Sequence, residues 1–421
     1  MGAIGRQLRT TGAGFALALA LSAAPALAQD EDGLRLSGEV SAVAGLAEGD
    51  GAADADALVR AEGAHVLASG LELGAGAALR ADGQRPYRTW TGGRYSSLLA
   101  GGTRGVGPAD ADLFLEGAYL FARGGLGSVY LGRDEGAAQR LAVTSPSIFR
   151  SVRVGDWRTD VTGLNDVHVV NDFSGTATKV TYMPPAGLFG GAIGQLRLGV
   201  SYAPSLGSCA GDCAPQDGFL LATGEDGEAR LFADQAWRDV VEAALYYQKG
   251  IGLAGDDLRL GLGASYVHAA EDERPASPLG VPGLALDDYR AVAVGMNLAY
   301  GGLTVGGSVK STNAGLAEHG QDYLAFDAGL TYEAGDWSFM LGYGAAEAGR
   351  DAGLLVGPAA AGPVPYALDR RTQTAQAGVS KALGQGVTLG VAAQFVDADK
   401  PDPLGGAKDA AAIVLESSIR F

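Results

Sequence analysis

Histidine, serine and carboxylate side chains are the groups that could carry catalysis or bind a metal, and their spacing argues against both. The four histidines, His65, His168, His268 and His319, lie in separate segments and form no H-x-x-x-H pair. The sequence has neither a nucleophile elbow nor a G-x-x-x-x-G-K-[ST] loop. Ser265 stands three residues before His268, the kind of pair that a hydrolase would require, but such a pair can arise by chance. We therefore expect no enzyme, unless hydrolysis is found and is lost in His268→Ala.

The first residues have the form of a secretory leader. Arg6 and Arg9 precede an apolar stretch, and Ala26-Leu27-Ala28 has the A-x-A form of a cleavage site. The sequence therefore predicts a signal peptide over residues 1–28 and an exported mature domain over residues 29–421.

Export bears on the two cysteines, Cys209 and Cys213, which lie together in a loop rich in Gly, Pro and Asp. In an oxidising compartment they could close a small disulfide. Their spacing builds no metal cluster or redox motif.

The charge balance excludes one class of partner. The chain has 31 Lys+Arg and 48 Asp+Glu, for a net charge of −17. No acid precedes Asp30, so removal of the leader takes away two arginines and leaves 29 against 48, or −19. A chain of this sign offers no basic surface to phosphate backbones, and we expect no nucleic-acid partner.

The remaining candidate for a functional site is a group of charged side chains in one long connection. Residues 134–176 are too long for an ordinary loop, yet they carry apolar side chains such as Phe149 and Trp157 that are atypical of disorder. Charges placed at a narrow point select solutes by field and by diameter. The charged residues of this segment are Asp156, Asp160, Asp166 and Asp172, with Arg150, Arg153 and Arg158.

The elements that must position this segment are strands, because apolar and polar residues alternate with period 2 along most of the chain. "AAIVLESSIRF" at residues 411–421 is one example, with Ile413, Leu415 and Phe421 on its oily face. Sixteen such segments occur, at residues 33–46, 58–68, 70–81, 111–122, 126–133, 177–184, 195–204, 237–248, 257–269, 288–300, 302–312, 321–333, 336–347, 369–381, 386–398 and 409–421.

The connections between these segments alternate in length. Short turns such as Ser69-Gly70 and "YGG" alternate with longer acidic stretches such as "AEGDGAADADA" at residues 47–57. Successive hairpins therefore turn at opposite ends of one sheet, with short turns at one end and long loops at the other. This pattern is typical of outer-membrane barrels.

A lipid bilayer explains the apolar faces of the predicted strands better than the core of a soluble protein does. No run of about 18 apolar residues follows the leader, but a tilted strand of about 9–11 residues crosses the hydrocarbon layer. All backbone groups must be paired there, so the sheet must close. We therefore predict an all-β fold, a transmembrane antiparallel β-barrel of sixteen strands that is wide enough for an aqueous channel. Tyrosines near strand ends predict an interfacial girdle: Tyr182, Tyr202, Tyr266, Tyr300 and Tyr332.

The parity of the strands also predicts which bases line the lumen. Facing the acids of 134–176, these bases would set a transverse field, although Arg150, Arg153 and Arg158 in the long connection leave the sign of ion selectivity open. The predicted wall bases are Arg35, Arg60, Arg80, Arg197, Arg259, Arg290 and Lys310.

Three stretches resemble Gram-negative general porins of the alphaproteobacterial type. They are the "LRLSGEVSAVAG" start, "ATKVTYMPPAGLFGG" followed by "LGVSYAP", and the terminal "SSIRF". The resemblance implies an outer-membrane homotrimer that passes small hydrophilic solutes and ions by passive diffusion. It also implies a third long loop, here about 134–176, that folds into the lumen. The terminal Phe421 would be the signal read by the barrel assembly machinery.

Other interpretations remain open. A substrate-selective porin would use aromatics near the mouth, such as Tyr87, Trp90 and Trp157, as a sugar slide. A structural or adhesin barrel would need a plugged lumen. We expect no tightly held cofactor or metal. The acids from Asp50 to Asp56 could loosely hold Ca²⁺ that bridges lipopolysaccharide, but they lack the EF-hand spacing, and a solubilising loop is the simpler interpretation. Membrane lipid and lipopolysaccharide are the expected surroundings.

Overall fold

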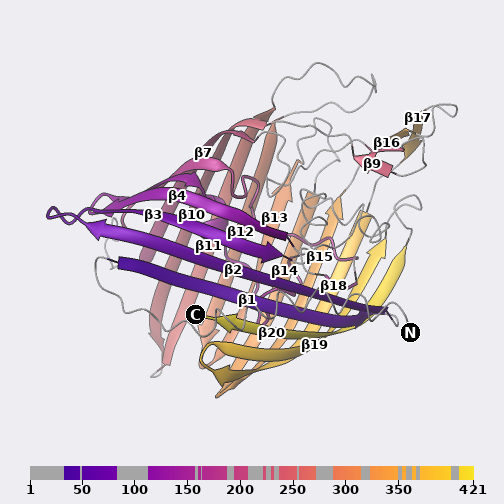
Figure 1. Ribbon diagram of the computed structural model, residues 1–421. Coiled ribbons are helices and arrows are strands. Elements are labelled where there is room, and N and C mark those ends of the chain that lie inside the picture. Colours follow the sequence, from indigo (N-terminus) through magenta and orange to yellow (C-terminus); the bar gives the residue numbers. More distant parts are fainter. Residues whose placement is uncertain are drawn as a thin grey trace.

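A closed barrel of sixteen antiparallel strands forms the body of the protein (Figure 1). The computed structural model describes residues 33–47, 50–82, 112–156, 160–162, 164–186, 194–206, 221–223, 229–231, 237–253, 256–271, 288–313, 323–348, 353–356, 363–366, 370–399 and 407–421. The barrel strands are β1 (Gly33–Ala47), β2 (Asp50–Val66), β3 (Glu72–Asp82), β4 (Asp112–Gly124), β5 (Gly127–Arg133), β6 (Thr178–Met183), β7 (Gln195–Leu206), β10 (Trp237–Leu253), β11 (Asp256–Glu271), β12 (Tyr289–Tyr300), β13 (Leu303–Thr312), β14 (Tyr323–Ala334), β15 (Trp337–Ala348), β18 (Arg370–Gly384), β19 (Val387–Asp399) and β20 (Lys408–Arg420).

The predicted sixteen-stranded barrel is confirmed, and β1 and β20 close it. Val40 lies opposite Ile419 and Ala44 opposite Leu415 in the register of this pair. Beyond β20, Phe421 exchanges two backbone hydrogen bonds with Gly38, at 3.0 and 3.2 Å. Gly38 has no side chain, and a Cβ there would meet the Phe421 ring. The last residue is therefore seated against β1, while its role as an assembly signal stays a prediction.

One predicted boundary is wrong in an instructive way. The stretch 47–57 was expected to be a long acidic loop, but β2 begins at Asp50 and its residues pair with β1 from Ala47 downward. Asp54-Ala55-Asp56-Ala57 keeps the period of a strand, with Asp56 opposite Ser41. The acids that could hold Ca²⁺ therefore belong to a strand. The signal peptide, Cys209, Cys213 and His319 lie outside the described residues.

The outer face of the barrel is apolar on strand after strand. On β12, Val292, Val294, Met296 and Leu298 alternate with inward residues, and all four are exposed. The girdle tyrosines Tyr182, Tyr202, Tyr266, Tyr300 and Tyr332 are exposed as well. Among the described residues, no helix is long and apolar enough to span a membrane.

A small sheet of four short strands stands apart from the barrel. It contains β8 (Leu221–Thr223), β9 (Ala229–Leu231), β16 (Gly353–Val356) and β17 (Pro363–Tyr366), in the order β17-β16-β8-β9. These segments belong to the long connections β7–β10 and β15–β18. Three or four residues are too few for a periodic signal, so the sequence did not predict this sheet.

Candidate functional site

The long connection between β5 and β6, called loop L3 and spanning residues 134–177, runs along the inner wall of the barrel. Its outgoing leg begins with helix α4 (Ala137–Arg140), passes Val143 at β11, and reaches β20 and β1 near Ser151. The returning leg contacts β14, β13 and β11 in turn. The described residues of L3 therefore cover the inner wall from β7 round to β1 and leave most of the wall of β2–β5 uncovered, with contacts there from Glu135 and Arg140.

Glycines on the inner wall make room for the outgoing leg. A Cβ at Gly263 or Gly295 would run into Val143, and one at Gly378 would run into the ring of Phe149. These positions, together with others facing the loop, form what we call the glycine bed: Gly45, Gly199, Gly263, Gly295, Gly329, Gly342, Gly378 and Gly390. The chain has 67 glycines, a larger fraction of its residues than the usual 7% or so. The glycine bed accounts for part of this excess.

Three carboxylates of the inner wall hold the outgoing leg by its backbone. Glu416 on β20 accepts the N–H groups of Arg150, Ser151 and Val152 at 2.7, 3.0 and 3.2 Å. Asp327 on β14 accepts from the backbone and hydroxyl of Ser145, and Glu242 on β10 accepts from Ala138 N–H at 3.2 Å. All three carboxylates are buried, where charge-assisted hydrogen bonds are strong. Sequence analysis did not single them out.

Two buried lysines hold the ends of L3 by their carbonyl groups. Lys310 on β13 donates to the Val170 carbonyl at 2.9 Å, and Lys179 on β6 donates to the carbonyls of Asp134 and Gly175 at 2.8 and 2.5 Å. Lys310 was predicted as a pore-wall base. It does face inward, but L3 buries it completely.

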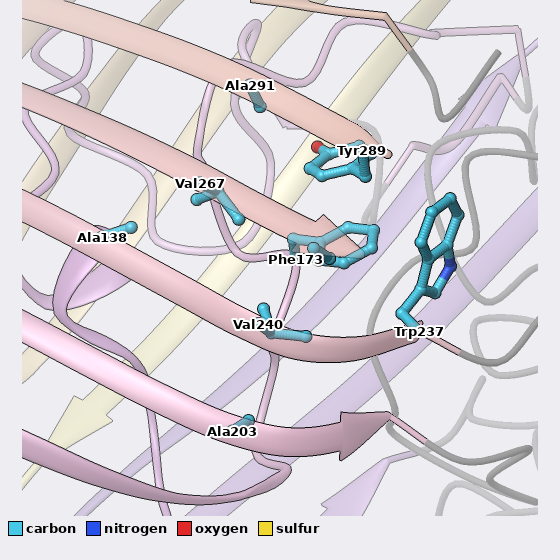
Figure 2. Close-up of a cluster of buried hydrophobic side chains, with 9 residues drawn as sticks. Ala138, Phe173, Ala203, Trp237, Val240, Val267, Tyr289 and Ala291 are labelled. Atoms are coloured by element: carbon cyan, nitrogen blue, oxygen red, sulfur yellow. The ribbon is translucent and has the colours of Figure 1, made fainter. Parts of the chain in front are cut away.

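Apolar packing anchors the returning leg near the long-loop end of the barrel. Figure 2 shows Phe173 of L3 between Tyr289 of β12 and Trp237 of β10. The Phe173 and Tyr289 rings are stacked with centroids 3.8 Å apart, and Trp237 meets Phe173 edge-on at 5.7 Å. The three rings are buried with Val267 and Val240.

Replacing Phe173 by alanine should lower the free energy of unfolding by about 3–5 kcal/mol, because it removes a fully buried ring. Urea unfolding of the barrel in detergent micelles measures this. Phe339→Ala is the matched control, since Phe339 lies exposed on the outer face of β15. Equal losses in the two variants would contradict the anchoring role of Phe173.

The acids predicted for the constriction mostly stabilise L3 itself. Asp160 accepts from the N–H groups of Thr162 and Asn165 at 3.0 and 2.9 Å. Asp172 lies 2.8 Å from Nε2 of His168. Asp160, Asp166 and Asp172 are all buried, so little of their carboxylate surface faces the lumen.

Asp156, Arg150 and Arg153 keep partial exposure among the described charges of the loop. Asp156 forms backbone bridges with both Arg153 and His168. Arg150 extends from L3 to Glu39 of β1, where Nη1 and Oε2 are 2.7 Å apart. Arg158 and the aromatics Tyr87, Trp90 and Trp157 lie outside the described residues.

The uncovered wall of β2–β5 carries arginines paired with carboxylates. Arg80 bridges Asp56 at 2.6 Å and Glu116 at 2.7 Å, and Arg60 reaches Glu135 of L3 at 3.0 Å. The expected arrangement, with acids on the loop and bases on the wall, therefore holds for Arg60 and Glu135. For Arg80 the carboxylates stand on the wall beside it, which shortens the range of its field.

Aromatic side chains also face the lumen from this wall. The Tyr119 hydroxyl donates to Glu62 at 2.6 Å. Arg123 pairs with Glu62 at 3.1 Å and lies 3.9 Å from the centroid of the Phe121 ring. Tyr130 has Arg140 of L3 4.5 Å from its ring centroid, a cation–π contact. Sequence analysis missed this cluster, although the inward parity of β4 and β5 was available to find it.

The other predicted wall bases divide by parity. Arg35, Arg197 and Arg259 share the inward parity of Ser41, Ser201 and Ser265, and all three are exposed. The prediction for Arg290 is wrong. It lies two residues before Val292, on the same outward face, and its partner in the β11 register is His268.

The Ser265–His268 pair is divided between the two faces of β11. Ser265 points inward and accepts from Asn171 at 3.0 Å, whereas His268 shares the outward parity of Tyr266 and lies 3.9 Å from Asp288. Within the described residues, no group of three or more His, Cys, Asp and Glu side chains could hold a metal ion.

A sequence model of Gram-negative porins matches residues 16–401, which is most of the chain. The chain belongs to the Gram-negative porin family. It is therefore an outer-membrane β-barrel that forms a channel for diffusion, and its family and fold are those of a channel. The curated proteins contain no significant match to it.

Solved porins and related barrels share the fold at low sequence identity. OmpF of Salmonella typhi in complex with daunomycin is 14% identical, covers 93% of this chain and 99% of its own, and superposes with a TM-score of 0.53. OmpT of Vibrio cholerae is 12% identical with coverage of 94% and 100% and a TM-score of 0.50. The outer-membrane channel DcaP of Acinetobacter baumannii is 14% identical with coverage of 92% and 97% and a TM-score of 0.50.

Proposed function

We propose that this porin is a general diffusion pore for small hydrophilic solutes, with a weak preference for cations. The observation that carries the proposal is the one-sided course of L3. The loop is held against the wall from β7 round to β1, so the free passage runs between its inner edge and the wall of β2–β5. No catalytic step is needed for this activity, and we propose that the protein is not an enzyme.

The charges bordering the passage support the cation preference. Five arginines of this region, Arg60, Arg80, Arg123, Arg140 and Arg150, are ion-paired. Their carboxylate partners are Asp56, Glu39, Glu62, Glu72, Glu116, Asp134 and Glu135. The inward Arg35 of β1 lies opposite Glu62, so seven acids stand against six bases. The negative excess is small, and close pairing weakens its field.

The reversal potential in a KCl gradient tests this preference. We expect the wild-type reversal potential to have the sign of a cation-selective pore. Its magnitude should be a small fraction of the limit for perfect selectivity, about 59 mV per tenfold gradient. Arg80→Gln should strengthen the cation preference, because Asp56 and Glu116 lose their partner. Glu116→Gln should weaken it. Shifts of the same sign in both variants would contradict the proposal.

A homotrimer is proposed from an asymmetry of the outer face. The described outward side chains of β1–β5 include no aromatic, since Tyr119, Phe121 and Tyr130 all face inward. Aliphatic residues occupy that face instead, with small ones such as Ala61 and Ala75 among larger ones such as Leu73 and Leu79. An aromatic girdle marks lipid contact, so its absence favours contact with other subunits. Ala61→Arg should convert the purified trimer to monomers in light scattering, and an unchanged mass would contradict the proposal.

A sugar-selective pore is the second candidate, and partly exposed Tyr130 at the passage favours it. It would show as a saturable block of ion current by a sugar, relieved in Tyr130→Ala. On the resemblance of the sequence we also propose the alphaproteobacterial type and recognition of Phe421 by the assembly machinery. Contact with lipopolysaccharide is proposed from the outer-membrane location, and pairing of Cys209 with Cys213 from their proximity in an oxidising compartment.

A further inference from the structure

A groove of about 490 Å³ lies in the outer surface of the barrel across β15, β18, β19, β20 and β1. Small side chains form its floor: Ala375, Ala377, Ala393 and Ala411. Larger apolar side chains also line it and all four are exposed: Leu46, Leu341 and Ile413 at its sides, and Phe395, which lies between Ala375 and Ala411 in the register. The hollow therefore results from a change of side-chain size within one apolar face.

The groove lies in the half of the barrel nearer the long connections. Ala375 is five residues from the start of β18, Ala411 is three from the start of β20, and Leu46 is one from the end of β1. All three of these strand ends lie at the long-loop end. In outer-membrane barrels the long loops are extracellular, so the groove faces the outer leaflet.

A polar row borders the groove on the extracellular side. The Tyr343 hydroxyl lies 2.8 Å from the side-chain amide of Gln373. The other amide atom of Gln373 lies 3.3 Å from Nε of Arg371. Arg371 is exposed and stands on the same outward face as Ala375. A guanidinium at this height is placed for a phosphate at the level of the lipid head groups.

We propose that the groove binds one acyl chain of an outer-leaflet glycolipid whose phosphate meets Arg371. The proposal rests on the outer-membrane location and is independent of the proposed ion preference. The side chains that line a lipid-facing groove gain van der Waals contacts only if an acyl chain occupies the groove and remains there. A linear acyl chain fills such a trough without strain. The nearby outward acids Asp397, Asp399 and Asp409 would be bridged to phosphate by divalent cations.

Binding of bisphosphorylated, hexa-acylated lipid A to the purified full-length protein tests this by native mass spectrometry with Mg²⁺ present. Phosphatidylethanolamine of matched chain length is the comparison lipid. Wild type should retain lipid A in at least tenfold preference. Ala393→Phe fills the groove and should abolish the preference, and the smaller change Ala377→Val should reduce it. Arg371→Gln should weaken lipid A binding without affecting phosphatidylethanolamine.

Ala243→Phe is the matched control, because Ala243 lies on the outward face of β10, away from the groove. It should bind lipid A as the wild type does, and every variant should keep the wild-type conductance. Equal loss in Ala393→Phe and Ala243→Phe would overturn the proposal. Dissociation of the subunits in Ala393→Phe with lipid binding intact would assign the groove to subunit contact and would overturn it as well. Equal retention of the two lipids by wild type would also overturn it.

Discussion

Gly295→Leu is expected to lower the single-channel conductance by roughly half, because field and diameter at a narrow point set the flow. A Cβ at Gly295 would overlap the carbonyl oxygen of Val143 on the outgoing leg of L3. The strand is fixed by ladders to β11 and β13, so the loop must yield. L3 can yield only by moving away from β12 toward the wall of β2–β5. This movement narrows the passage between the loop and that wall.

Gly250→Leu is the control for this prediction. Gly250 shares the inward parity of Glu242 on β10, but a Cβ there meets nothing within 4 Å. This variant should conduct as the wild type does in planar bilayers. If Gly295→Leu conducts like Gly250→Leu while both fold, the glycine bed does not position L3.

Glu416→Ala should have the opposite effect. The substitution removes the acceptor of three consecutive N–H groups at residues 150–152. Each buried donor left unpaired costs about 1–3 kcal/mol, so this part of L3 should leave the wall and hydrate. We expect larger and noisier conductance steps.

Two further variants separate the carboxylate from its neighbourhood. Glu416→Gln keeps one acceptor oxygen and should give an intermediate conductance. Ser418→Ala changes a buried residue on the same face of β20 and should leave conductance unchanged. Quiet steps of wild-type size in Glu416→Ala would contradict the role assigned to this carboxylate.

The barrel could be predicted from the sequence because its information is local. Alternation of period 2 gives each strand, and the alternation of short and long connections gives the topology. The parity argument also worked for Arg35, Arg60, Arg80, Arg197, Arg259 and Lys310, which all face inward. It was misapplied to Arg290, although Val292 and Val294 in the same strand share its face.

The site could be predicted less well because its contacts are distant in sequence. Glu416 meets L3 across 264 to 266 positions, and Asp327 meets Ser145 across 182. No pattern along the chain distinguishes such a carboxylate from one that faces water. For the same reason Asp160, Asp166 and Asp172 were expected to line the pore, while the structure buries them within L3.

Excision of most of L3 tests the central claim, that this loop inside the barrel narrows a water-filled channel. Val143 meets Gly263 and Asn171 meets Ser265, so the two legs stand two residues apart on β11. A short Gly-Ser link can therefore replace residues 144–170 and leave both anchors in place. Single-channel recording in planar bilayers should show discrete steps for the wild type and steps several times larger for the excised variant, because the lumen of a sixteen-stranded barrel is wide. Steps of equal size, or no steps from an intact wild-type barrel, would contradict the account.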